Sequence, residues 1–267
     1  MSAATPLTGC GVLVTRPQPQ AQALMDCITA AGGRALHLPA LEIAPPTDPG
    51  PLRAALAGLA DFDLALFASA NAVRGLLAEA GGGIDWPARL MTGAVGAKTA
   101  AALEAAGIAV TLVPETGFDS EHLLALPALA EVAGRRVLLV SGEGGRELLR
   151  DTLTTRGAEV VQVASYCRRL PAVDPSPVLD AWSAGGIQAV TVASNESLHN
   201  LFELIGQKGQ TLLRETWLVV PGRRADALAG SLGIRRRIIA ANATDEAMCQ
   251  ALVDWAAGTQ GKEGQHE

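Results

Sequence analysis

The 267-residue chain is long enough for two compact domains, and its 49% apolar and 18% charged residues are typical of a globular protein. Its net charge of −6 argues against a nucleic-acid surface, because phosphate binding needs a concentrated basic face. The sequence holds no apolar run long enough to span a bilayer and begins without signal-peptide features, so we expect a cytoplasmic protein that does not bind membranes.

Short apolar runs alternate with longer helical patterns along most of the chain. The runs predict strands at residues 12–15, 35–38, 64–67, 91–95, 110–113, 137–140, 160–164, 189–192, 217–220 and 237–240. Helical stretches such as residues 21–32 and 146–157 lie between them and end at glycine, which favours a helix stop. This succession predicts an α/β fold with two parallel sheets of about five strands each and helices on both faces.

The two halves of the sequence resemble each other when residue 11 is placed over residue 136. At this offset residues 11–39 lie over 136–164 and residues 67–77 over 192–202, and with one extra residue 95–108 lie over 221–234. The overlaid segments match strand on strand and helix on helix, with Ser69 on Ser194. Any two parallel α/β units look somewhat alike, but a nearly constant offset favours an internal duplication.

Proline-rich stretches at residues 38–51 and 170–177 predict the connections between two lobes. Each stretch follows the second strand of its half, so we expect the chain to begin one lobe, cross to the other and return. Two antiparallel crossings would then form a hinge. The predicted first lobe is residues 1–38 plus 173–258, the second lobe is residues 46–164, the crossings are residues 39–45 and 165–172, and residues 259–267 form a disordered tail.

Small, hydroxylated and basic residues follow the predicted strands at six strand-to-helix turns. In parallel sheets, ligands bind beyond the carboxyl ends of the strands, where free N–H groups at helix N-termini attract anions. The candidate binding residues are Arg16, Ser69, Asn71, Gly96, Lys98 and Thr99 in the first half, and Ser141, Gly142, Arg146, Ser194, Asn195, Ser197, Gly222, Arg223 and Arg224 in the second. They predict a large ligand with several carboxylates or phosphates in a cleft between the lobes.

Each of these residues also has a purely structural interpretation. A serine or asparagine at a helix start is first of all an N-cap, and Asp119 and Ser120 look like caps alone. The GEGG stretch at residues 142–145 lacks the spacing of a nucleotide-binding loop, and no hydrolase or zinc-protease motif is present. The sequence therefore favours a binding cleft with few catalytic side chains.

The cysteines show no pattern that would bind a metal or mark a redox motif. Cys10, Cys27, Cys167 and Cys249 are far apart and form no C-x-x-C pair, and the four histidines are equally scattered. We therefore expect free thiols, no metal site and no cofactor held by these residues.

The chain contains a single tyrosine, Tyr166, just after the predicted strand at residues 160–164. The duplication places it over Leu41, so the first half has no matching hydroxyl. A phenol stays protonated at neutral pH and can donate a proton. Tyr166 is thus either a catalytic proton donor or a packing residue of the hinge.

Several segments occur in an order and spacing that can be compared with known families. They are VLVTRPQPQAQALMDCITAAGGRALHLPALEI (12–43), FASANAV (67–73), AVGAKTAAALEAAGI (94–108), GRELLRDTLTTRGAEVVQVASYCRRLP (145–171), VTVASNESL (190–198), VVPGRRADAL (219–228) and ATDEAM (243–248). Together they resemble the uroporphyrinogen-III synthase family over nearly the whole chain. The resemblance implies two flavodoxin-like lobes joined by a two-segment connection, with the active site in the cleft between them.

The resemblance also implies an activity. The family consists of hydro-lyases without cofactor or metal, which cyclise the linear tetrapyrrole hydroxymethylbilane to uroporphyrinogen III. Water is lost and the terminal pyrrole ring is inverted, through an azafulvene and a spiro intermediate. The product leads to haem, sirohaem, cobalamin and chlorophyll. The resemblance further implies a monomer, with transient contact to hydroxymethylbilane synthase.

The family's functional residues can be assigned to positions in this chain. Tyr166 matches a tyrosine that assists departure of the substrate's hydroxyl group, and Thr99 matches a threonine that lines the cleft. The substrate's carboxylates would bind main-chain N–H groups and hydroxyls at the six turns. The candidate cationic partners are Arg16, Arg146, Arg223 and Arg224.

Two other classes of function remain open at this point. A binding protein for a polyanionic metabolite, without turnover, would need the same turns but would not need Tyr166. A nucleotide-dependent α/β enzyme would need a phosphate-binding loop of regular spacing.

Overall fold

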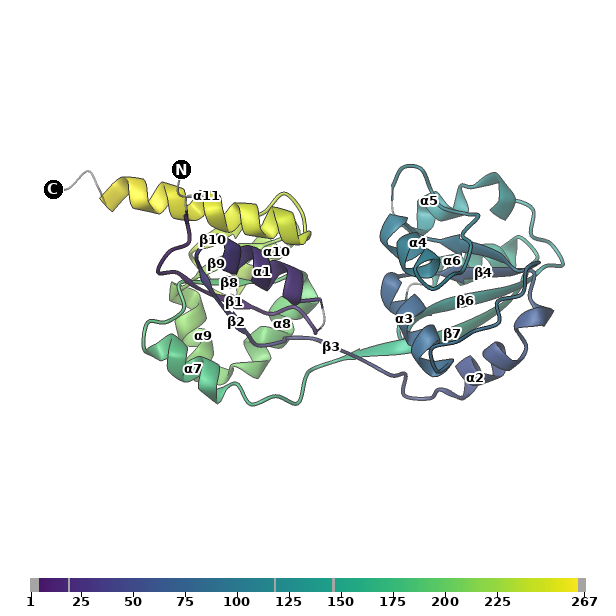
Figure 1. Ribbon diagram of the computed structural model, residues 1–267, viewed down its shortest axis with the longest axis horizontal. Helices are drawn as coiled ribbons and strands as arrows, with labels where there is room; N and C mark the ends of the chain where they lie inside the picture. Colours follow the sequence, from purple (N-terminus) through teal and green to yellow (C-terminus); the bar gives the residue numbers. More distant parts are fainter. Residues whose placement is uncertain (1–4, 19, 118, 146, 264–267) are drawn as a thin grey trace. The chain divides into compact units, whose positions relative to one another are not determined.

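The computed structural model describes residues 5–18, 20–117, 119–145 and 147–263. The chain divides into two compact units after Glu42 and after Arg168 (Figure 1). Unit 1 contains the chain up to Glu42 and again from Arg169, and unit 2 is Ile43–Arg168. Both divisions fall inside the segments predicted as crossings, residues 39–45 and 165–172. The exact lobes and the hinge stay predictions.

Unit 1 is built on a five-stranded sheet in the order β10-β9-β8-β1-β2. Each pair of neighbouring strands is parallel. Its elements are β1 (Gly11–Val14), α1 (Gln22–Ala30), β2 (Arg34–His37), α7 (Ser176–Ser183), β8 (Ala189–Thr191), α8 (Asn195–Leu204), α9 (Gly206–Glu215), β9 (Trp217–Val220), α10 (Arg223–Ser231), β10 (Arg237–Ile239) and α11 (Asp245–Glu263).

Unit 2 is built on the second five-stranded sheet, in the order β3-β7-β6-β4-β5. Strands β7, β6, β4 and β5 are parallel. The elements are β3 (Glu42–Ala44), α2 (Gly50–Ala57), η1 (Leu59–Asp61), β4 (Leu64–Phe67), α3 (Ala70–Glu79), β5 (Met91–Ala94), α4 (Ala97–Glu104), α5 (Ser120–Leu124), η2 (Pro127–Leu129), β6 (Arg136–Gly142), α6 (Leu148–Thr155) and β7 (Glu159–Arg169).

Helices cover both faces of each sheet, as the alternation of strands and helices predicts. In unit 1, α1 and α11 lie on one face and α7, α8 and α9 on the other (Figure 1). Successive residues of β1 point to opposite faces, so Val12 packs with α1 and α11 while Leu13 packs with the opposite helices. Each sheet therefore has two hydrophobic cores, and the predicted parallel α/β fold is confirmed.

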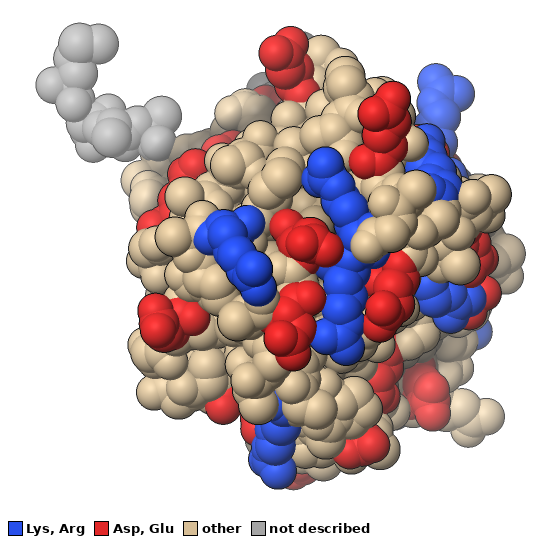
Figure 2. All heavy atoms as spheres, turned by 90° about the vertical axis from the view of Figure 1, so that its right-hand side faces the viewer, with Lys and Arg blue, Asp and Glu red and all other residues tan. Residues whose placement is uncertain are grey.

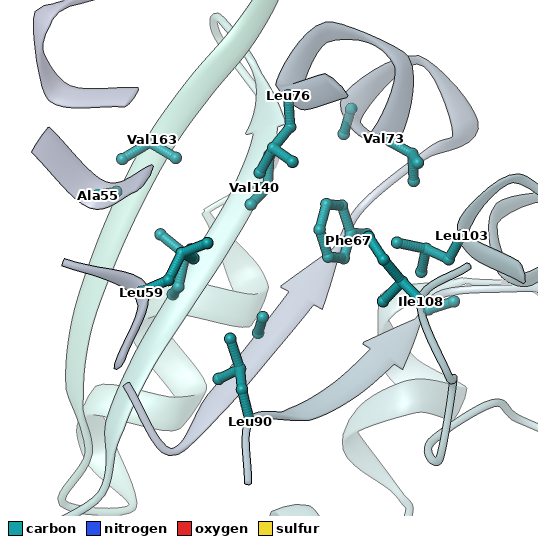
Figure 3. Close-up of a cluster of buried hydrophobic side chains, with 14 of the residues drawn as sticks. Ala55, Leu59, Phe67, Val73, Leu76, Leu90, Leu103, Ile108, Val140 and Val163 are labelled. Atoms are coloured by element: carbon teal, nitrogen blue, oxygen red, sulfur yellow. The ribbon is translucent and has the colours of Figure 1, made fainter. Parts of the chain in front are cut away.

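Phe67 at the end of β4 fixes the position of α3 in unit 2. Figure 3 shows its ring among Val73 and Leu76 of α3 and Leu103 of α4, all fully buried. Burying a side chain of this size contributes about 1.5–3 kcal/mol. Ser69 follows two residues later and caps α3, so this packing also sets where the helix begins.

Charged side chains on the surface are mixed in sign. Figure 2 shows acidic and basic residues interleaved on the face turned toward the viewer. Within the described part of the chain, no helix is both long enough and apolar enough to cross a membrane.

One predicted strand is missing from the structure, and one strand of the structure was not predicted. Residues 110–113 form no strand beyond an isolated bridge between Gly93 and Leu112, because Pro114, which follows, has no N–H to extend the ladder. The sequence also missed β3, a three-residue strand inside the proline-rich stretch.

Strand β7 is longer than predicted and continues to Arg169, so Tyr166 lies within the strand and not after it. The added length pairs with the end of β6, where Gly142 lies opposite Tyr166.

The strands predicted to correspond occupy corresponding places in the two sheets. Strand β1 lies between β2 and β8 in unit 1, and β6 lies between β7 and β4 in unit 2. This order is what a duplicated unit would give, although the duplication itself stays a prediction.

Helix α11 continues to Glu263, so residues 259–263 are helical where the sequence predicts a disordered tail. A helix once formed gains one hydrogen bond for each added residue, which favours this extension. Residues 264–267 of that tail lie outside the described residues.

The expectation of four free thiols is wrong for two of them. Cys27 of α1 and Cys249 of α11 are joined by a disulfide, with 222 residues between them in sequence. Cys10 and Cys167 are free, and burial raises the pKa of the Cys10 thiol. Spacing rules missed the pair because α1 and α11 are brought together only by the tertiary fold.

We expect loss of this disulfide to lower the free energy of unfolding by about 2–4 kcal/mol, because the bond restricts the unfolded chain. Urea denaturation of the oxidised protein, the reduced protein and Cys27→Ser measures the effect. The reductant should have no further effect on Cys27→Ser. Alkylation of all four cysteines in the native, unreduced protein would contradict the assignment.

Candidate active site

A β-bulge between β6 and β7 presents Tyr166. The pairing shifts after Ser141, so that Ser141 faces Ala164 while Gly142 faces Tyr166, and Ser165 is the extra residue. A bulge redirects the side chains that follow it. As a result Ser165 and Tyr166 are both buried, at 1% and 4% exposure, although they are adjacent in a strand.

Helix α3 comes into direct contact with the bulge. A Cβ atom on Gly75 would lie 2.2 Å from the carbonyl oxygen of Ser165, so only glycine permits this approach. The Ser165 hydroxyl in turn donates to the carbonyl oxygen of Ala72, at 2.9 Å. The helix is thus held against β7 at the residue before Tyr166.

This contact brings the N-terminus of α3 to the phenol. Ser69 is the N-cap, and its Oγ accepts a hydrogen bond from the N–H of Ala72 at 3.1 Å. The same Oγ lies 3.3 Å from the phenolic oxygen of Tyr166. Ser69 is therefore both a cap of α3 and a neighbour of the phenol.

A cation also lies beside the phenol. The guanidinium of Arg168 donates from Nη2 to the phenolic oxygen at 3.3 Å, and its central carbon lies 5.7 Å from the ring centroid. Residues two apart in a strand point to the same face, which places Arg168 beside Tyr166.

These groups line a cavity of about 450 Å³ in unit 2, at the carboxyl ends of β4, β5 and β6. Ser69, Ser141, Gly142 and Tyr166 are the predicted site residues that line it. The lining also contains residues that were not predicted as site residues: the apolar Ala68, Val95, Leu139 and Leu149, and Asp119, Ser120, Glu143, Gly144, Gly145 and Arg168. The interpretation of Asp119 and Ser120 as caps alone is incomplete, because Asp119 caps α5 and both residues line the cavity.

The glycine-rich loop after β6 forms one wall of the cavity. A Cβ on Gly142 would lie 2.6 Å from Cζ of Tyr166, so glycine leaves the space that the ring occupies. The carboxylate of Glu143 accepts hydrogen bonds from the N–H and, at 3.0 Å, the hydroxyl of Thr47. The N–H of Glu143 donates to the carbonyl of Tyr166 at 2.9 Å.

The other predicted residues of unit 2 that the structure describes do not line this cavity. Asn71 accepts a hydrogen bond from Arg74 on the surface of α3, at 2.8 Å. Gly96, Lys98 and Thr99 lie at the start of α4, where Lys98 is exposed and Thr99 is only 4% exposed. Arg146 lies outside the described residues.

The predicted residues of unit 1 are divided between structural and exposed positions. Arg16 lies 3.1 Å from the carboxylate of Asp245 at the start of α11, and its side chain is 14% exposed. Ser194 and Ser197 form a capping box at the start of α8. Asn195 at the start of α8 and Arg223 and Arg224 at the start of α10 are all exposed. Gly222 is the N-cap of α10.

Comparisons with known proteins agree on one family. A family model described as uroporphyrinogen-III synthase HemD matches residues 22–250. A uroporphyrinogen-III synthase of Escherichia coli K12 is 36% identical over 90% of this chain and 99% of its own length, and one of Synechococcus elongatus is 35% identical over 75% and 76%.

The chain belongs to the uroporphyrinogen-III synthase family.

Solved structures show that the fold is shared. A uroporphyrinogen III synthase of Thermus thermophilus superimposes with a TM-score of 0.58 at 21% identity, covering 94% of this chain and 99% of that one. The synthase of Helicobacter pylori 26695 also gives 0.58, at 15% identity, covering 92% and 99%.

Arg168 and Glu143 line the cavity of this family member, but the sequence did not mark them as site residues. The distance of two residues from Tyr166 within a strand is the signal that could have found Arg168. No sequence signal places Glu143 against Thr47, because that contact depends on how the loop after β6 folds.

We expect Gly142→Ala to displace the Tyr166 ring, because the new methyl group would overlap its Cζ. The cost in unfolding free energy should be about 1–3 kcal/mol, as for other overpacked sites. Since Tyr166 is the only tyrosine, NMR of ring-labelled tyrosine reports on it alone. The resonance should shift in Gly142→Ala and stay in place in Gly83→Ala, where an added methyl meets nothing within 4 Å. An unmoved resonance in Gly142→Ala would contradict the geometry.

Proposed function

We propose that this protein cyclises hydroxymethylbilane to uroporphyrinogen III, without cofactor or metal, as a hydro-lyase of tetrapyrrole biosynthesis. Membership of the family supports the reaction. The observation that supports the mechanism is the phenol of Tyr166, buried at the edge of a polar cavity between a serine hydroxyl and a guanidinium.

The first step is loss of water. The lone pair of a pyrrole nitrogen expels the hydroxymethyl oxygen, and Tyr166 donates a proton so that the oxygen leaves as water. The nitrogen then loses its N–H proton, which leaves a neutral azafulvene. The protein needs only to supply one proton donor and to recover the proton.

The second step is ring inversion. The substituted carbon of the terminal pyrrole attacks the azafulvene carbon and forms a spiro intermediate, which fragments and closes with that ring reversed. These intermediates react on their own, so the protein acts by holding the chain folded and by disfavouring direct end-to-end closure.

Binding of the substrate's carboxylates falls to the strand-to-helix turns. In unit 2 the proposal assigns this role to the main chain and hydroxyls of Ser69, Ser141 and Gly142, and to Asn71, Gly96, Lys98 and Thr99 at the starts of α3 and α4. In unit 1 it assigns the role to Arg16, Ser194, Asn195, Ser197, Gly222, Arg223 and Arg224. Arg146, in the chain segment of unit 2, is also assigned this role. Arg223 and Arg224 suit this role best, because Arg16 already pairs with Asp245.

The lobes, the hinge and the inter-lobe cleft predicted from the sequence are part of this proposal, as are a monomeric state and action in the cytoplasm. A short-lived substrate also favours transient contact with hydroxymethylbilane synthase, which produces it.

An isomer assay tests the proposal. Hydroxymethylbilane generated in situ should give the type III isomer with the purified protein, without added metal or nucleotide. Formation of the type I isomer alone, at the spontaneous rate, would support a binding protein without turnover.

Tyr166→Phe should lower turnover roughly tenfold or more, as expected for loss of one proton donor. As a control, Ser231→Ala removes an exposed hydroxyl and should keep full activity.

A further inference from the structure

The proposed proton donor has a cation as its neighbour, and the proposed function gives that cation no role. We propose that Arg168 is a positioning residue: it directs the proton of Tyr166 toward the cavity and stabilises the phenolate that remains after proton transfer. This inference rests on the proposed function, and it adds a residue that acts through Tyr166.

The direction of the hydrogen bonds follows from the chemistry of the partners. A guanidinium has donors and no acceptor, so the phenolic oxygen must accept from Arg168. Ser69 Oγ already accepts from the Ala72 N–H, which leaves its own proton available for the phenol. Both neighbours can therefore donate to the same oxygen.

When Ser69 donates to the phenolic oxygen as well, the phenol's own proton points elsewhere. Tyr166 is 4% exposed, and its ring lies against Gly142, where even a Cβ atom would come within 2.6 Å of Cζ. The cavity that Tyr166 lines is the remaining direction for the O–H bond. Arg168 therefore orients the proton toward the space where a leaving hydroxyl group would lie.

The same two donors stabilise the product of proton transfer. When the C–O bond breaks, the leaving oxygen takes the phenolic proton and departs as water, and Tyr166 becomes a phenolate. Hydrogen bonds to a charged acceptor are about twice as strong as neutral ones, so the Arg168 and Ser69 contacts gain strength in this state. The pyrrole N–H proton released as the azafulvene forms restores the phenol.

Arg169 provides a matched control, because it is the next residue and carries the same charge. Its guanidinium makes two hydrogen bonds to the carboxylate of Glu42, at 2.8 and 2.9 Å, and lowers the pKa of that carboxyl. Substituting Arg169 thus removes a neighbouring charge without removing the donor to Tyr166.

A spectroscopic test needs no substrate. The Raman doublet of tyrosine changes its intensity ratio according to whether the phenolic oxygen accepts or donates, and this chain has one tyrosine. The wild-type ratio should be that of an acceptor. Arg168→Met should shift it toward a donor, while Arg169→Met should leave it unchanged. An unchanged ratio in Arg168→Met would overturn the proposal, whatever the outcome of the isomer assay.

A double-mutant cycle tests the catalytic consequence. Arg168→Met should lower kcat roughly tenfold with little change in KM, the size expected for one charge-assisted hydrogen bond, and Arg168→Lys should restore part of the loss. In the Tyr166→Phe background, Arg168→Met should cost nothing further. Equal losses in both backgrounds, or a rise in KM alone, would show that Arg168 binds a substrate carboxylate instead and would overturn the inference.

Discussion

The candidate site depends on one close contact, that of α3 with the bulge of β7. The backbone of Gly75 touches the carbonyl of Ser165, and the hydroxyl of Ser165 holds the carbonyl of Ala72. A glycine in a helix costs about 0.5–1 kcal/mol relative to alanine. Glycine is nevertheless needed at position 75, because the close contact brings the N-cap Ser69 to the phenol of Tyr166.

The bulge and the helix together explain how a single tyrosine could catalyse loss of water. The bulge turns Tyr166 inward beside the glycine-rich loop, and the helix supplies a hydroxyl and the positive end of its dipole. Arg168, two residues further along the strand, supplies a cation. The phenol thus has a hydroxyl and a guanidinium as hydrogen-bonding neighbours, which suits a residue that gives up one proton while the intermediates react on their own.

The sequence predicted the parts of the fold that depend on local pattern. Apolar runs and helix-ending glycines indicated the parallel strands of both sheets, and the ends of those strands are where Ser69, Ser141 and Gly142 line the cavity with Tyr166. The features that it missed depend on tertiary contacts. Strand β3 is too short to show a period, and the disulfide joins helices at opposite ends of the chain. The bulge that turns Tyr166 inward depends on the pairing of β6 with β7, which the sequence does not show.

The same limit applies to the assignment of individual side chains. A serine that follows a strand has the same sequence pattern whether it caps a helix, binds a ligand or does both. In the structure Ser69 caps α3 beside the phenol, whereas Ser197 is buried in its capping box. Likewise Arg16 has the sequence position of a ligand-binding cation, yet it pairs with Asp245, which lies far from it in the sequence.

The central claim is that the leaving hydroxyl group of the substrate lies next to Tyr166. The most direct measurement titrates the protein with a linear tetrapyrrole in which a methyl group replaces the hydroxymethyl group, and follows the ring-labelled tyrosine by NMR. We predict a saturable shift of the single tyrosine resonance, with the same midpoint as binding measured by calorimetry. Saturable binding of the analogue with an unmoved tyrosine resonance would contradict the account.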